Sequence, residues 1–275
     1  MSQQSTSTET GSKREFPKAL KNTVGHQTSY DCNEIEIPDS FLTGPSPLPV
    51  TLTHVPFADS ELPEYKDKVA FVVKNVFSPE ECQQFLKLAE LAAPWDKALV
   101  NVGGGKEAYD PGYRDSKRII WDTPTVADRV FKRIIGVPGV KEILSDSEQW
   151  ELEKLNERMR VLKYVPGQFF KGHVDGVYAY TSNGDTFASR YTLHLYLNGS
   201  AASSPTEEAE LVGGATAFLS KDETRHMDVN PETGSVLIFQ HEGLWHEGAT
   251  VLKGVKYTVR TDFMYRQVKE SGALE

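Results

Sequence analysis

The chain has 275 residues, with 30 Lys and Arg against 39 Asp and Glu, so its formal net charge at pH 7 is −9. A hydrophobic content of 39% is enough for a substantial core and excludes a wholly disordered chain. The acidic balance argues against a dedicated nucleic-acid-binding protein, and the presence of only two cysteines excludes a disulfide scaffold and a Cys-rich zinc ribbon.

Targeting signals are not apparent in the sequence. It contains no run of 18 apolar residues, so we expect no membrane-spanning helix and no membrane partner. Residues 1–14 are polar and have no apolar core of a secretory signal, and residues 272–275 form no retention or peroxisomal signal. The sequence therefore predicts a cytoplasmic or nuclear protein and does not distinguish the two compartments.

Three regions of different character follow one another along the chain. Residues 1–34 are polar and aperiodic, which predicts a disordered tail. Residues 35–67 are rich in proline, which predicts an extended segment that wraps around the rest of the protein. Residues 68–275 carry the regular patterns, and we predict that they form a single domain.

Two helices are predicted early in this domain, after a strand over residues 68–73. Ser78-Pro79-Glu80-Glu81 combines an N-cap, a proline at the first helical position and a glutamate at the third, so a helix begins there and ends near Ala93. Thr123-Pro124 opens a second helix that runs through Ile135. The glycine-rich residues between them, 103–116, are predicted to be irregular.

After a charged stretch that ends near Asn156, short β-rich runs separated by turn signals dominate the chain. The predicted strands are 158–165, 190–198, 215–219, 225–229, 235–240 and 255–265. Helices followed by evenly spaced short strands predict an α+β fold in which helices pack outside a jelly-roll barrel.

A metal site is predicted from His173-Val174-Asp175 and a later histidine. Residues i and i+2 of a strand project to the same side, so His173 and Asp175 can bind one cation together. The buried strand over 235–240 leads to His246, and two imidazoles with one carboxylate form the facial triad of non-haem Fe(II). Zinc favours a closed tetrahedral site and Mg or Ca favours more oxygen ligands, so iron is the first choice. His241 is the competing candidate for the distal ligand.

A buried cation is predicted beside this metal. The strand that follows His246 places Lys256, Thr258 and Arg260 on one face. A positive charge inside a barrel is costly unless an anion neutralises it, and a dicarboxylate that chelates the iron at one end would present its other carboxylate there. Either Lys256 or Arg260 can be the main carboxylate clamp, because arginine forms the better bidentate fork.

These residues resemble a known family. His173-x-Asp175, His246 and a lysine ten residues after His246 resemble the 2-oxoglutarate- and Fe(II)-dependent dioxygenases, in particular the prolyl 4-hydroxylase-like branch. Tyr164, nine residues before His173, and the runs 192–198 and 213–218 also match, so the resemblance covers about residues 68–267. Many relatives outside this branch have arginine where this chain has Lys256.

The resemblance implies a double-stranded β-helix core, Fe(II) bound by His173, Asp175 and His246, and 2-oxoglutarate and O₂ as cosubstrates, with ascorbate supporting activity. The residues that it implies for cosubstrate binding are Lys256 at the distal carboxylate, Tyr196 as a hydroxyl donor to that carboxylate, and Tyr164 at the chelating end. We predict Arg260 and Thr192 as further cosubstrate-binding residues. The residues that we predict on the substrate side are Arg114, His194 and Trp245.

The predicted function is the hydroxylation of an unactivated C–H bond, with release of succinate and CO₂. A peptidyl proline is the first candidate substrate, and a free amino acid or a natural-product intermediate is the alternative. Desaturation or ring closure in place of hydroxylation stays open, as does the oligomeric state. A non-catalytic metal-binding barrel is the interpretation from a different functional class.

Overall fold

The computed structural model of the chain describes residues 26–27, 30–103, 106–145, 148–203 and 210–269, and a pair of antiparallel β-sheets dominates these residues. The larger sheet has the order β2 (Thr51–His54), β3 (Ala70–Lys74), β17 (Val236–Gln240), β13 (Asp185–Tyr196), β20 (Lys256–Gln267), β10 (Arg158–Tyr164), β8 (Lys117–Asp122) and β4 (Asp96–Lys97). Two further strands join it, β12 (Ala179–Ser182) beside β13 and β9 (Trp150–Leu155) beside β20.

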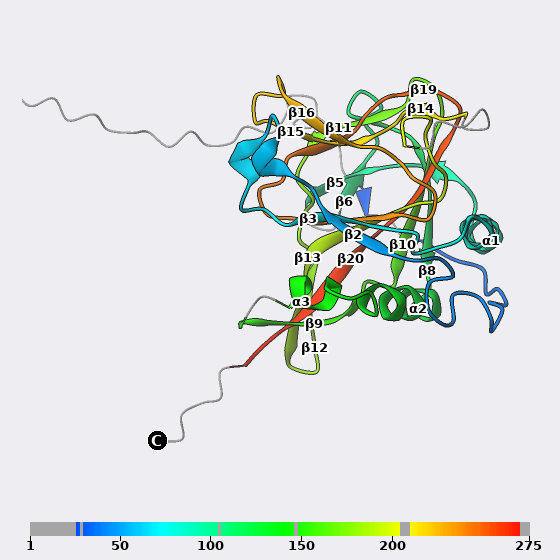
Figure 1. Cartoon of the computed structure of the whole chain (residues 1–275). Coiled ribbons are helices and arrows are strands. Elements are labelled where there is room, and N and C mark those ends of the chain that lie inside the picture. The colour runs from blue at the N-terminus through cyan, green and yellow to red at the C-terminus, as the bar shows by residue number, and fades with distance from the viewer. Residues whose placement is uncertain (1–25, 28–29, 104–105, 146–147, 204–209, 270–275) are drawn as a thin grey trace, which may run out of the picture.

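The smaller sheet has the order β16 (His226–Val229), β15 (Thr216–Leu219), β18 (His246–Gly248), β11 (Phe169–His173) and β7 (Arg114–Asp115). Figure 1 shows β11, β15 and β16 of the smaller sheet above β10, β13 and β20 of the larger one. The remaining strands form two small sheets, β1 (His26–Gln27) with β6 (Lys106–Ala108) and β5 (Val100–Gly103), and β14 (Val212–Gly213) with β19 (Val251–Lys253). The two facing sheets are the jelly-roll arrangement that the sequence predicts.

Alternation along the strands gives the larger sheet two different faces. On β13, Leu193 and Leu195 belong to the apolar core on the helix side, whereas Tyr196 packs with Phe218 and Phe239 inside the barrel. The interior of the barrel therefore receives every second residue of β13 and of its neighbours. This is the face on which the candidate site is built.

Three helices cover the outer face of the larger sheet, and in Figure 1 α2 (Pro124–Ile135) and α3 (Val140–Leu144) lie along its lower side. The first helix, α1 (Pro79–Ala92), begins at Ser78 with the predicted capping box. Its Phe85 packs edge to face on Trp121 of β8 at a centroid distance of 5.8 Å. The helices thus seal the side of the sheet that faces away from the candidate site.

The predicted helices and the later strands are confirmed to within a few residues at their ends, but one expectation is wrong and one strand was not predicted. The segment 103–116 is not simply irregular, since it contains β6 and β7. The charged stretch before Asn156 is the strand β9, whose acidic face pairs with Arg266 of β20 while Trp150 and Leu152 pack against the core. Its acidic residues hid an ordinary two-residue alternation.

The proline-rich segment over 35–67 contains the extended strand β2, but it is not wholly extended, because it also contains two 3₁₀ turns, η2 (Phe57–Asp59) and η3 (Pro63–Tyr65). The predicted tail over 1–34 lies mostly outside the described residues, and the single domain over 68–275 stays a prediction. None of the helices in the described portion of the chain is long and apolar enough to cross a membrane.

Candidate active site

The site is built where β11 and β18 meet at their ends. His173 is the last residue of β11 and is the register partner of His246, the first residue of β18. Asp175 follows His173 by two residues, and one ligand atom from each of these three side chains lies within 4.8 Å of the others. Neighbouring strands thus bring together residues 71 or more positions apart in the chain.

Both imidazoles are fixed in the orientation that metal ligation requires. Nδ1 of His173 donates to the Lys171 carbonyl at 2.8 Å, and Nδ1 of His246 donates to the Leu244 carbonyl at 3.1 Å. Each Nε2 therefore has its lone pair free, and each lies 3.8 Å from a carboxylate oxygen of Asp175. Because two neutral imidazoles and one carboxylate are the donor set of a facial triad, these residues fit Fe(II).

Burial keeps the imidazoles neutral. It lowers the pKa of His173 to about 3, with His246 as the next cause, and it also lowers the pKa of His246. Burial alone would raise the pKa of Asp175, but the charge of Arg260 is the largest opposing cause, and the pKa is held well below its usual value. The three donors are therefore in the protonation states that bind a metal ion.

Asp175 is held from two sides. The Thr192 hydroxyl donates to Oδ2 of Asp175 at 2.5 Å, and Nη2 of Arg260 lies 3.0 Å from Oδ1. Arg260 is held in turn by Asp262, also at 3.0 Å, and His241 lies 3.4 Å from the same Asp262 oxygen. His241 is thus placed with Asp262, and it is His246 that joins His173 and Asp175.

Lys256 is buried at the start of β20. Its side chain is 2% exposed, and Nζ lies 5.6 Å from the ring of Tyr164 and 5.7 Å from that of Tyr196. No carboxylate among the described residues lies within 4.0 Å of Nζ, and burial lowers the pKa of Lys256 to about 7. His194 stacks on Tyr196 at 5.2 Å, and its Nε2 has no hydrogen-bond partner within the residues that the structure describes.

The surroundings of Lys256 are therefore short of an anion, as the sequence predicts for a carboxylate clamp. The Tyr196 hydroxyl donates to Oγ1 of Thr216 at 2.8 Å. Arg260 lies beside Asp175 and Asp262, and Lys256 lies between the two tyrosine rings. The two candidate clamps are thus in different surroundings.

The predicted substrate-side residues lie around the triad. Arg114 is 8% exposed, and its guanidinium lies 4.4 Å above the ring of Phe170, which stacks on His173 at 3.8 Å. Nε1 of Trp245 donates to Glu223 at 2.9 Å, and Trp245 packs so closely on Gly172 that a Cβ there would lie 2.6 Å from Nε1. The sequence pattern alone did not indicate a role for Phe170 or for the glycine at position 172.

The segment of the chain that carries this site matches a known family. Residues 159–263 match the 2OG-Fe(II) oxygenase superfamily. No curated protein matches the sequence.

Among solved structures, a viral collagen prolyl hydroxylase from Paramecium Bursaria Chlorella virus-1 is similar, with 18% identity, a TM-score of 0.43, and coverage of 72% of this chain and 96% of that one. A Pseudomonas putida prolyl-4-hydroxylase also has 18% identity, with a TM-score of 0.42 and coverage of 67% and 82%. A Trichoplax adhaerens prolyl hydroxylase in complex with a hypoxia inducible factor peptide has 14% identity, a TM-score of 0.48, and coverage of 70% and 82%.

The family match confirms the predicted resemblance and the double-stranded β-helix fold class, and with them the enzyme class, a 2-oxoglutarate-dependent dioxygenase. This class implies Fe(II), 2-oxoglutarate and O₂.

Proposed function

We propose that this protein is a prolyl 4-hydroxylase-like oxygenase that hydroxylates a peptidyl proline. The observation that carries the oxygenase assignment is the largely buried cluster of His173, Asp175 and His246, in a barrel that also holds a buried lysine, Lys256, with no carboxylate partner among the described residues. A metal chelated by one end of a dicarboxylate and a cation that pairs with its other end would satisfy both features. The prolyl substrate rests on the resemblance of the sequence.

In this proposal, His173, Asp175 and His246 hold the iron, and Lys256 binds the distal carboxylate of 2-oxoglutarate. Bound Fe(II) would supply the oxidation of an unactivated C–H bond, coupled to decarboxylation of 2-oxoglutarate to succinate and CO₂. Tyr164 and Tyr196 form the walls beside Lys256, and their rings exclude water from the charged pair. Dry surroundings make the pairing of carboxylate and ammonium stronger than it is in water.

Around the metal ligands, Thr192 and Arg260 orient the Asp175 carboxylate, and Phe170 holds the ring of His173 by stacking. We assign Arg114, His194 and Trp245 to the surroundings of the substrate. The role of these side chains is to fix the geometry of the reacting centre, which is the main contribution of a protein to cofactor chemistry.

The test is succinate formation under air with Fe(II), ascorbate and 2-oxoglutarate, with and without proline-containing peptides and free amino acids. Ascorbate is included because we propose that it supports activity. Stimulation by a proline peptide supports the full proposal, whereas stimulation by a free amino acid alone replaces the peptide by a small-molecule substrate. Protein that holds iron and 2-oxoglutarate but forms no succinate with any of these compounds would instead be a non-catalytic barrel.

A further inference from the structure

Arg260 pairs with Asp175, and Asp262 connects it to Arg160. Two further arginines, Arg114 and Arg118, both donate to the Leu99 carbonyl. Arg118 on β8, Arg160 on β10 and Arg260 on β20 come from neighbouring strands of the larger sheet, and Arg114 comes from β7 of the smaller one. Arg160 and Arg260 are register partners on adjacent strands. Burial is the first cause that lowers the pKa of Arg114 and that of Arg160, and the charges of Arg118 and Arg260 also lower both.

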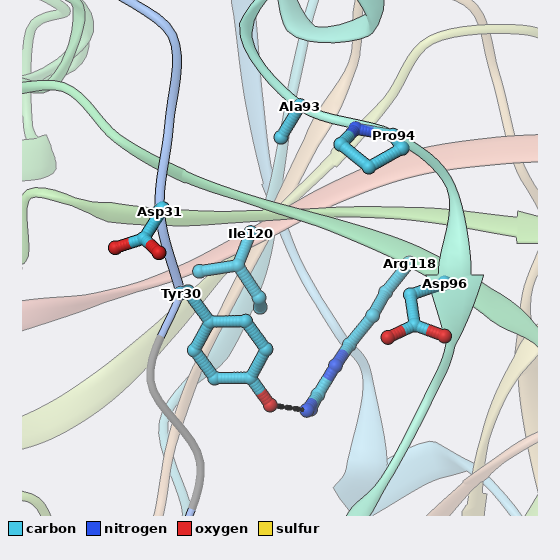
Figure 2. A pocket seen from close by; sticks show the side chains of 7 residues that line it. All are labelled: Tyr30, Asp31, Ala93, Pro94, Asp96, Arg118 and Ile120. Atoms are coloured by element: carbon cyan, nitrogen blue, oxygen red, sulfur yellow. Dashed lines mark hydrogen bonds between the residues drawn. The ribbon is translucent and has the colours of Figure 1, made fainter.

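Two of the four, Arg118 and Arg260, have close carboxylate partners in the fold, although Nε of each has no hydrogen-bond partner among the described residues. Arg118 donates to both carboxylate oxygens of Glu107 at 2.9 Å and also to the Tyr30 hydroxyl, a contact that Figure 2 shows. Arg260 is shared between Asp175 and Asp262 at 3.0 Å each. These two guanidinium groups therefore have carboxylate partners in the fold itself.

The other two have donors to spare. Arg160 makes one contact, 3.3 Å from Nη1 to Asp262, which Arg260 already engages, and its side chain is 23% exposed. Arg114 has no carboxylate within 4.0 Å among the described residues; it donates to the Leu99 carbonyl at 3.3 Å and to Ser116 at 3.4 Å. The four arginines thus have three carboxylate partners among the described residues, Glu107, Asp175 and Asp262. Bound iron would also be neutralised in part by Asp175, which leaves less negative charge for the arginines.

We propose that the primary substrate carries a carboxylate close to the carbon that is oxidised, and that Arg160, which Asp262 and Arg260 connect to Asp175, binds this carboxylate. A buried cation without a full counter-charge is costly, and an incoming carboxylate removes that cost while a neutral group does not. This inference rests on the proposed function, and it names the chemistry of the substrate within it.

The cosubstrate does not account for the same charge. Arg260, the register partner of Arg160, lies four residues beyond Lys256 on β20, which corresponds to about 13 Å along a strand. The carboxyl carbons of extended 2-oxoglutarate are only about 5 Å apart. In the proposed function the distal carboxylate of 2-oxoglutarate is on Lys256 and its other end is on the metal, so the proposal assigns Arg160 to a different anion.

The carboxylate has two possible sources, the α-carboxylate of a free imino or amino acid and an acidic side chain next to the reacting residue of a peptide. We would measure dissociation constants by calorimetry for protein loaded with Mn(II) and 2-oxoglutarate. The ligands are L-proline beside L-prolinamide, and N-acetyl-Pro-Asp-amide beside N-acetyl-Pro-Asn-amide. The pair in which the acid binds more tightly than the amide shows whether the carboxylate comes from a free amino acid or from an acidic side chain of a peptide.

We expect the acid of one pair to bind about tenfold or more tightly than its neutral partner. Arg160→Gln should reduce this difference to within about twofold, Arg160→Lys should restore some of it, and neither should change the affinity for 2-oxoglutarate. The matched control is Arg158→Gln, two residues earlier on the same face of β10, because Arg158 is 40% exposed and paired with Asp122. Thermal unfolding without ligand verifies that each variant is folded.

The proposal is overturned if no acid binds, if acids and amides bind equally, or if Arg160→Gln weakens 2-oxoglutarate and leaves the preference for acids intact. The last result would assign Arg160 to the cosubstrate. Wild-type protein that binds neither Mn(II) nor 2-oxoglutarate would refute the proposed function, and this inference with it. Because loading is measured before any acid is added, the two failures are distinct.

Discussion

Replacing Lys256 by methionine is expected to stabilise the ligand-free protein and, at the same time, to remove its affinity for 2-oxoglutarate. The lysine is 2% exposed and has no carboxylate within 4.0 Å in the described portion of the chain. Methionine keeps most of the volume of the side chain and removes the amine. The two effects have opposite signs, so a general loss of structure cannot imitate them.

The magnitude follows from the pKa, which burial lowers from 10.5 to about 7. At pH 7 Lys256 is fully protonated in the unfolded chain but only about half protonated in the folded chain. The lower pKa in the folded state therefore disfavours folding by about 4 kcal/mol. Imperfect packing of the methionine costs up to about 1.5 kcal/mol. We therefore expect the free energy of unfolding to rise by about 2–4 kcal/mol at pH 7.

The pH dependence has a definite sign. Between pH 7 and pH 10.5 the unfolded wild-type chain binds more protons than the folded one, so wild-type stability rises with pH in this window. Above it, Lys256 is neutral in both states. The advantage of the variant should therefore shrink as the pH rises and should nearly vanish by about pH 10.5.

The assay is urea unfolding in a metal chelator at pH 7 and pH 10, together with calorimetric titration of 2-oxoglutarate into Mn(II)-loaded protein. Affinity for 2-oxoglutarate should fall by about 100-fold in Lys256→Met. The control is Lys117→Met on β8, an exposed lysine whose replacement should change neither quantity. The prediction is refuted if Lys256→Met is less stable than wild type at pH 7, or if it is stabilised by the same amount at pH 7 and at pH 10.

Three further predictions concern the metal ligands and the fold. His246→Ala should abolish Mn(II) binding and succinate formation while the far-ultraviolet circular dichroism stays unchanged. The control is His226→Ala, which replaces an exposed histidine on β16 and should keep both Mn(II) binding and succinate formation. Metal binding that survives in His246→Ala contradicts the assignment of His246 as a ligand. The Mn(II) dissociation constant should change less than about tenfold between pH 5.5 and pH 7.5, because His173 has a pKa of about 3 and burial lowers the pKa of His246 below its ordinary value. Two ordinary histidines would weaken Mn(II) binding about 100-fold at the acidic end. Gly234→Ala should lower the free energy of unfolding by more than about 3 kcal/mol, since its φ is +72° and a Cβ would lie 1.9 Å from the Phe77 carbonyl oxygen. The control Gly167→Ala, at a residue with φ +87° and no atom within 4 Å of the added Cβ, should lower it by only about 1 kcal/mol. Equal losses of stability in urea unfolding would mean that the close contact at Gly234 is relieved without cost.

Much of the architecture was predictable from short stretches of sequence. The first helix was placed by Ser78 and Glu81, which satisfy each other's backbone amides wherever the rest of the chain lies. The strand β9 was missed although its residues alternate, because Glu151 and Glu153 made the stretch look solvated. Only their pairing with Arg266 on β20 shows that this acidic face belongs to a sheet.

The sequence by itself determined the chemistry of the metal site. His173 and Asp175 are two residues apart on one strand end, and the ten-residue spacing from His246 to Lys256 is a property of the chain that needs no coordinates. The sequence alone offered no geometric reason to choose His246 over His241 as the distal metal ligand. That separation required the structure, in which His241 faces Asp262 and His246 faces His173.

Only the tertiary structure showed which of Arg114, Arg118, Arg160 and Arg260 lack a full counter-charge. Arg160 and Asp262 are 102 residues apart, and their contact exists because β10 and β20 pair in one particular register. Caps and strand alternation act between near neighbours in the chain, so the sequence displays them. Charge balance inside a barrel is decided by strand pairing over long separations, and a shift of one residue would point each of these side chains to the opposite face.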